Sequence, residues 1–197
     1  MKDTYGTVIV DLILEEEEIM RRLHKDARWG INRAIREGLI VEESTDWLSI
    51  YDIYKDIMDG GGSEALEIGN LSKDAVVLFV CKKEDKIIAG ASLTIEEGRC
   101  TLQMNASLKE YQNCQPNNLL YWECIKWAKK KGYEILDLGG WQINAEGHLE
   151  GINKFKEKWG QIAYYDKDYP FFRAIGRKLI KKSHFLFNLN KKLRGRK

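Results

Sequence analysis

Lys156 is the side chain of this sequence whose surroundings most suggest chemistry. It follows Phe155 in a short predicted helix, residues 151–159, and a glycine-rich polar stretch separates that helix from a buried-looking strand at residues 133–138. A lysine at the mouth of an α/β sheet lies where such proteins bind ligands, and its ammonium can stabilise an oxyanion or hold a phosphate. The alternative is a solvated lysine on a charged helix, with Phe155 and Trp159 packed in the core.

A glycine pair ends the predicted strand. Gly139 and Gly140 lack a Cβ atom, so a ligand can approach the backbone closely there, although such a pair can equally mark a turn. Asp137 precedes them and points away from its apolar neighbours in the strand. It is either a buried acid that orients Lys156 or accepts a proton, or a half-exposed strand residue. We predict Lys156 and Asp137 as catalytic residues, with substrate contacts at Phe155, Gly139, Gly140 and Trp141.

Further candidates for phosphate binding lie outside this segment. Arg28, Arg33 and Arg36 lie on a long predicted helix near the N-terminus, and guanidinium groups bind phosphates through paired N–H bonds. Tyr111 precedes the start of another helix at Pro116, where backbone N–H groups can bind an anion. We predict Arg28, Arg33 and Tyr111 as substrate-binding residues, and a solvated helix face is the alternative for the arginines.

Several well-known catalytic patterns are missing. The sequence holds no GxSxG elbow, no P-loop, no HExxH and no Rossmann glycine triplet. Its four cysteines show no CxxC spacing, and its three histidines pair with none of them at zinc-ligand spacing. We therefore expect reduced thiols and no metal site. The remaining chemistry is group transfer between two positioned substrates, without a protein nucleophile or a bound cofactor.

The charges divide the chain into a body and a tail. Residues 171–197 carry ten Lys or Arg and no acid, whereas the rest carries 22 basic and 30 acidic residues. Aromatic and aliphatic residues lie among the basic ones, so the tail resembles a basic amphipathic helix. It suits an anionic membrane surface or RNA phosphates, or it packs on its own domain. We predict a single domain at residues 1–170, followed by this tail.

The body alternates predicted strands and helices. Strands are predicted at residues 7–14, 39–43, 75–82, 87–96, 99–106, 133–138 and 162–165. Helices are predicted at residues 15–38, 47–58, 116–131 and 151–159, with residues 84–85 as the turn of a hairpin. No run of 18 apolar residues indicates a membrane span. The order predicts an α/β (α+β) domain with a mixed, mainly antiparallel sheet flanked by helices.

Most of the chain resembles the Fem-type aminoacyltransferases, which build peptidoglycan bridges, and the wider GNAT-like acyltransferase group. VIVDL, the following helix with Arg28, Asn32, Arg33 and Ala34, and GLIVEE are similar to the opening of a Fem GNAT-like domain. GASLTIEEGRC is similar to its central hairpin. NNLLYWECIKWAKKKGYEILDLGG, followed by GINKFKEKWG, resembles its closing motif and is the most specific match. The resemblance implies a GNAT-like fold and transfer of an acyl or aminoacyl group to an amine.

The resemblance also implies substrates and a role for Lys156. Together with Phe155, it matches a lysine implicated in phosphate binding and catalysis in that family. The implied donor is aminoacyl-tRNA, and the implied acceptor is a nucleotide-linked or lipid-linked muropeptide. The chain has one GNAT-like domain where the family has two, which points to a homodimer or to a different substrate. Residues 112–118 contain no glycine, which argues against acetyl-CoA, because its pyrophosphate requires a close backbone approach.

We therefore expect a cytoplasmic aminoacyl- or acyltransferase that forms an amide on a cell-wall precursor or another amine, with aminoacyl-tRNA as donor. A tail that binds lipid would place it peripherally at the inner membrane face. The first alternative is an N-acyltransferase that uses acyl-CoA. The second is a GNAT-like module without catalysis that docks on a membrane or on RNA.

Overall fold

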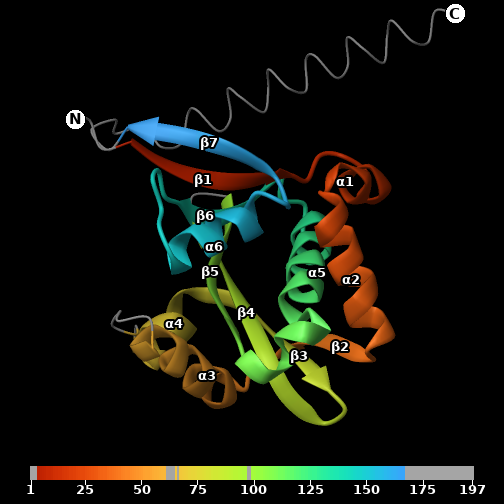
Figure 1. The fold of residues 1–197 in the computed structure, drawn as a ribbon, viewed down its shortest axis with the longest axis vertical. Helices are drawn as coiled ribbons and strands as arrows, with labels where there is room; N and C mark the ends of the chain where they lie inside the picture. Colours follow the sequence, from red (N-terminus) through yellow and green to blue (C-terminus); the bar gives the residue numbers. More distant parts are fainter. Residues whose placement is uncertain (1–3, 61–64, 66, 97–98, 167–197) are drawn as a thin grey trace, which may run out of the picture.

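The computed structural model describes residues 4–60, 65, 67–96 and 99–166 (Figure 1). The predicted domain boundary at residue 170 and the predicted basic helix at residues 171–197 lie outside the described residues. None of the helices in the described part of the chain is long and apolar enough to cross a membrane.

A single mixed sheet forms the centre of the described structure. Its strands lie in the order β2-β3-β4-β5-β6-β1-β7, and only the β5–β6 pair is parallel. The predicted mainly antiparallel sheet is therefore confirmed. The strands are β1 (Thr4–Asp11), β2 (Leu39–Ser44), β3 (Ala75–Lys83), β4 (Lys86–Glu96), β5 (Arg99–Ser107), β6 (Ile135–Trp141) and β7 (Gln161–Asp166).

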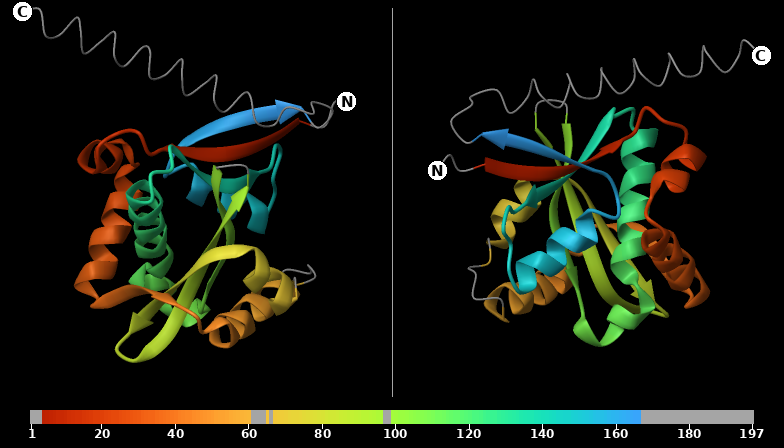
Figure 2. Two further views of the ribbon diagram at one scale, coloured as in Figure 1. Left: turned by 180° about the vertical axis from the view of Figure 1, so that it is seen from behind. Right: turned by 45° about the horizontal axis from the view of Figure 1, so that its top comes forward.

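Helices cover both faces of this sheet. Figure 2 shows α1, α2 and α5 on one side and α3 with α4 on the other. The bounds are α1 (Glu16–Arg22), α2 (Lys25–Arg36), α3 (Trp47–Gly60), α4 (Ile68–Asp74), α5 (Pro116–Lys130) and α6 (His148–Lys156), with a 3₁₀ helix η1 (Lys109–Cys114) before α5.

Two hydrophobic clusters form the core, one on each side of the sheet. Along β3, Val77, Phe79 and Cys81 belong to the cluster under α1, α2 and α5, whereas Leu78 and Val80 belong to the cluster under α3 and α4. This alternation follows from the two-residue period of a strand. The continuous apolar run at residues 77–81 therefore packs against both hydrophobic clusters, one on each face of the sheet.

The predicted helix at residues 15–38 is wrong in one respect, because it is two helices. Leu23 and His24 have extended backbone, with ψ of 147° and 149°. The His24 N–H donates to the Lys158 carbonyl oxygen at 2.9 Å, and Arg28 Nη1 donates to the carbonyls of Arg21 and Leu23 at the end of α1. A partner 134 positions along the chain thus interrupts a pattern that is helical by local criteria.

Two other predicted elements are displaced along the sequence. The predicted strand at residues 7–14 ends at Asp11, because Asp11 Oδ1 accepts from the Ile13 N–H and turns the chain there. The predicted helix at residues 151–159 begins and ends three residues earlier, so that Lys156 is its last residue.

The sheet is irregular where β5, β6 and β1 meet. The parallel β5–β6 pairing covers only Cys100 with Leu136 and Thr101 with Asp137. On the other side of β6, Thr7 pairs with Gly140 and Ile9 with Asp137, so two β6 residues lie opposite one β1 residue. Such a bulge bends a strand and re-aims its backbone.

Candidate functional site

Lys156 lies at the carboxyl end of α6 with its ammonium against the glycine pair of β6. Nζ donates to the Gly140 carbonyl oxygen at 3.0 Å, and it lies 3.6 Å from the point where a Cβ on Gly139 would stand. Gly139 has a φ of +76°, a conformation that glycine adopts without strain. Lys156, Gly139 and Gly140, which were all predicted as site residues, therefore lie together.

Burial sets the electrostatics of this lysine. The half-buried position of Lys156 lowers its pKa, because the charged form loses hydration, while the nearby Asp137 carboxylate acts in the opposite direction. An ammonium has three N–H donors. Gly140 takes one, and within the described residues no other acceptor bonds to Nζ, which leaves two donors for a ligand.

The lysines two positions before and after Lys156 are paired with other groups. Lys154 pairs with Glu150 on the same helix at 2.5 Å, and Lys158 lies 3.7 Å from Asp26 at the start of α2. Lys156 therefore differs from both in lacking a carboxylate within salt-bridge distance among the described residues.

Asp137 is buried, and both of its oxygens have partners. Oδ1 accepts from the Thr7 hydroxyl and from the Gly139 N–H at 2.8 Å, and Oδ2 forms an ion pair with Arg99 Nη1 at 2.9 Å. The printed partners of Asp137 do not include Lys156, so its two predicted roles, orienting Lys156 or accepting a proton, stay predictions. The Gly139 N–H is bonded to Asp137 and is therefore not free to donate to an oxyanion.

Phe155 lies in a ring cluster between α6 and α5. Its ring meets Tyr121 edge-on at 5.0 Å, and Trp159 lies 5.3 Å from the same Tyr121 ring. Trp159 is buried, and Phe155 packs against the core. The packing alternative thus accounts for both rings, and their effect on the site is to fix the α6 end that carries Lys156.

The loop between β6 and α6 is held by contacts that the sequence analysis missed. The Asn153 side chain is buried, donates to the Gln142 carbonyl at 2.6 Å and accepts from the Gln142 N–H at 3.1 Å. Trp141 Nε1 donates to Glu157 Oε1 at 2.7 Å. Asn153 lies three positions before Lys156, so helical spacing is the one local signal that links them.

The other predicted binding residues lie in different surroundings. Arg28 binds carbonyls at the end of α1, and Arg33 Nη2 pairs with Glu37 at 2.6 Å. Tyr111 lies on η1 with the Lys86 ammonium 4.9 Å from its ring centre. The contacts of these three residues are thus with other elements than α6, and the structure does not bring them to Lys156.

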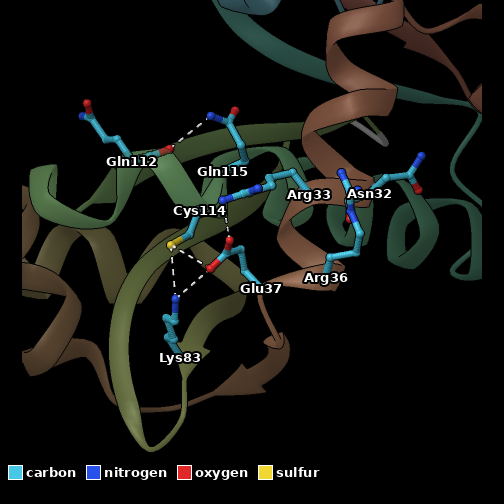
Figure 3. Close-up of polar contacts among 8 residues, drawn as sticks. All are labelled: Asn32, Arg33, Arg36, Glu37, Lys83, Gln112, Cys114 and Gln115. Carbon is cyan, nitrogen blue, oxygen red and sulfur yellow. Dashed lines mark hydrogen bonds and ion pairs between the residues drawn. The ribbon is translucent and has the colours of Figure 1, made fainter.

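Arg33 belongs to a polar cluster between α2, β3 and η1 (Figure 3). Glu37 accepts from Arg33 through one oxygen and from Lys83 Nζ at 2.9 Å through the other. Cys114 Sγ lies 3.4 Å from the same Lys83 Nζ. Cys114 is half-buried, whereas Cys81, Cys100 and Cys124 are buried, and burial raises the pKa of Cys81 and Cys100 to about 12.

No group of metal-binding side chains occurs in the described parts of the chain. All four cysteines are free thiols. The site around Lys156 therefore offers a cation, a glycine-lined backbone and an anchored loop, which suit positioning and charge stabilisation.

Comparisons with known proteins place this geometry in a fold. The acetyltransferase (GNAT) domain family matches residues 64–157. Among solved structures, FemX is similar with a TM-score of 0.70 and 16% identity over 82% of this chain and 60% of that one. No curated protein matches the sequence.

Two further structures are similar to this chain. The C-terminal domain of a putative lysylphosphatidylglycerol synthetase from Agrobacterium fabrum has a TM-score of 0.59 and 18% identity, over 81% of this chain and 58% of that one. L-PGS from Bacillus licheniformis has a TM-score of 0.57 and 18% identity, over 86% and 63%. The chain spans about three-fifths of these proteins. The GNAT-like fold and the resemblance to Fem-type proteins at the level of that fold are confirmed.

Proposed function

We propose that this protein is an acyltransferase that forms an amide on an amine acceptor, with Lys156 stabilising charge in the transition state. The observation that carries the proposal is the Lys156 ammonium, half-buried, anchored once on Gly140 and left with two donors. The GNAT domain match and the likeness to FemX support the reaction class.

The reaction we propose is aminolysis of an activated acyl group. The acceptor amine attacks the ester carbonyl of the donor, a C–N bond forms, and the carbonyl oxygen becomes an oxyanion. The C–O bond to the donor then breaks, and the proton lost by the amine ends on the departing hydroxyl. Lys156 donates to the oxyanion or to an adjacent phosphate. Asp137 holds the turn at Gly139, against which the Lys156 ammonium lies.

Aminoacyl-tRNA is the donor that we favour over acyl-CoA. At the start of α5, Gln115 has a left-handed φ of +63°, and its side chain accepts from Asn118 Nδ2 at 2.8 Å. Pro116 has no N–H, and the Asn118 N–H bonds to the Gln115 carbonyl at 3.1 Å. A CoA pyrophosphate would require free backbone N–H donors at this helix start. Position 116 offers none, and the N–H of Asn118 is already bonded to a carbonyl oxygen.

A muropeptide amine is the acceptor that we favour, on the likeness to FemX. The donor places the reaction in the cytoplasm, and the basic residues 171–197 would allow contact with the inner membrane face or with tRNA.

A competition between donors tests this proposal. The full chain is incubated with a muropeptide amine and either a mixture of charged tRNAs or acetyl-CoA, and products are identified by mass spectrometry. We expect an aminoacyl mass increase on the acceptor with charged tRNA. Acetyl transfer with micromolar CoA affinity would instead establish the acyl-CoA alternative. Absence of transfer from both donors, to this and to other amines, would leave a docking module without catalysis.

A further inference from the structure

The outward face of α2 carries an exposed tryptophan among cations. Trp29 is 54% exposed, Lys25 precedes it by four residues, and Arg33 and Arg36 follow it by four and seven. Residues at these spacings share one face of a helix. We name Lys25, Trp29, Arg33 and Arg36 the α2 stripe. An exposed indole bordered by basic side chains can stack on a base while the cations reach the adjoining phosphates.

The opposite face of α2 anchors the helix. Ala27, Ile31 and Ala34 are buried in the core, and a Cβ on Gly30 would stand 2.5 Å from the Asn118 side chain of α5. Because the apolar side of α2 packs against the core, the α2 stripe faces solvent from a helix that is fixed in place.

The α2 stripe has positive charge available for a ligand. Neither Lys25 nor Arg36 forms an ion pair within the described residues, and Arg36 Nε bonds only to the Asn32 carbonyl, at 3.3 Å. Arg33 pairs with Glu37, but Glu37 also holds Lys83, so the cations around it outnumber the acid (Figure 3). The acid within α2, Asp26, lies 3.7 Å from Lys158 and 3.6 Å from His24 Nδ1.

The start of α2 lies beside the segment that follows Lys156. His24 donates to the carbonyl of Lys158, which follows Lys156 by two residues. From Lys25 to Arg36 the helix then rises about 16 Å. A chain of phosphates along this stripe would therefore end near the segment that carries Lys156.

We propose that the α2 stripe binds the single-stranded end of the RNA donor, with a base stacked on Trp29 and phosphates on Lys25, Arg33 and Arg36. This rests on the proposed aminoacyl-tRNA donor. Stacking on an aromatic ring within a basic track is how proteins bind single strands without reading sequence. A membrane surface fits less well, because an interfacial helix needs a broad apolar face and this one presents a single ring between cations.

The test is binding of the full chain to a short fluorescent RNA that ends in CCA, measured by fluorescence anisotropy. Trp29→Ala should weaken binding at least about fivefold, through loss of stacking. Arg36→Ala should lower the slope of log affinity against log salt by about 0.7, the value for one phosphate contact on a single strand. The matched controls are Ile35→Ala, an exposed apolar residue on another face of α2, and Lys130→Ala, an exposed cation on α5. Both should bind like the wild type.

Equal affinity of the wild type, Trp29→Ala and Arg36→Ala would overturn the proposal, provided that circular dichroism shows all of them folded. Loss of binding to vesicles of phosphatidylglycerol and phosphatidylcholine in these variants, with RNA binding unchanged, would assign the stripe to a membrane instead. If the wild type transfers from charged tRNA but Trp29→Ala and Arg36→Ala bind the RNA as the wild type does, the stripe proposal is refuted and the proposed function is not. If the two variants bind the RNA more weakly but the wild type transfers nothing, the stripe proposal is supported and the proposed function is refuted.

Discussion

Replacing Lys156 by methionine is the sharpest test of the site. Methionine keeps the length of the side chain and removes the charge, so the packing of α6 is retained while the ammonium is lost. The matched control is Lys154→Met on the same helix, because Lys154 is exposed and pairs with Glu150. The variant Lys156→Arg restores a cation with a different shape.

The expected loss follows from the two free donors of Nζ. Removing one preorganised oxyanion donor reduces kcat by about 10²- to 10³-fold, or about 2.7–4 kcal/mol. Because the ammonium is half-buried, solvent replaces it poorly, and Lys156→Met should reach this range. A loss confined to kcat indicates that Lys156 contacts the developing oxyanion. A rise in KM alone indicates that Lys156 binds a phosphate of the substrate already in the ground state. Lys154→Met should change neither constant.

The pKa of Lys156 gives a second signature. Burial lowers it, so the folded state binds fewer protons than the unfolded state between this lowered pKa and the ordinary value of 10.5. Stability therefore rises with pH through that interval, and at neutral pH the buried charge is a cost. Lys156→Met should melt at the same temperature as the wild type or higher, although it loses activity.

The pH profile of turnover distinguishes a cation from a base. If protonated Lys156 acts, wild-type kcat falls as pH rises through the lowered pKa. In Lys156→Arg the guanidinium stays charged, so that descending limb should disappear from the profile. Single-turnover aminoacyl transfer at a series of pH values measures both. Turnover in Lys156→Met that equals that of Lys154→Met, in folded protein, would refute the assignment, as would an activity that rises through the same pH range.

Three further substitutions, and Gly132→Ala as a control for the first, probe the surroundings of this lysine. Gly139→Ala and Gly132→Ala, at φ of +76° and +85°, should each cost about 1–2 kcal/mol in thermal unfolding, but only Gly139→Ala should also lower kcat, because Gly132 has open space around it. Asp137→Asn breaks the ion pair with Arg99 and should cost about 3 kcal/mol in urea unfolding; a change under 0.5 kcal/mol would contradict this contact. Asn153→Ala should cost about 1–3 kcal/mol and speed proteolysis of residues 142–147, and unchanged cleavage would refute its role.

Elements with strong local signals could be predicted from the sequence. Pro116 at the first position of α5 and Gly132 just after it gave the bounds of that helix almost correctly. The turn at Glu84 and Asp85 joins β3 to β4 as expected, with Glu84 at a φ of +55°. In both cases the information lies within a few residues, so no tertiary contact is needed to read it.

The remaining features depend on partners far apart in the chain. The end of α1 requires Lys158, and the partners of Asp137 come from Thr7 in β1 and Arg99 in β5. The position of β6 between β5 and β1 is likewise a property of the whole sheet. The sequence showed Asp137 as equally suited to a buried or a half-exposed place, because the residues that decide between them are remote.

The place where the parallel pairing stops explains why this acid and this lysine belong together. After Thr101 and Asp137 the β5–β6 ladder ends, so beyond this point β6 is paired only with β1 among the described strands, across the bulge. Asp137 constrains this segment further by binding the Gly139 N–H, which holds the glycine at positive φ. Lys156 then bonds to the next carbonyl, that of Gly140. If this sequence of contacts positions the ammonium, Asp137→Asn and Lys156→Met should be non-additive in kcat, because the first change already displaces what the second removes. Additive losses in a double-mutant cycle would show that Asp137 stabilises the sheet without positioning the lysine.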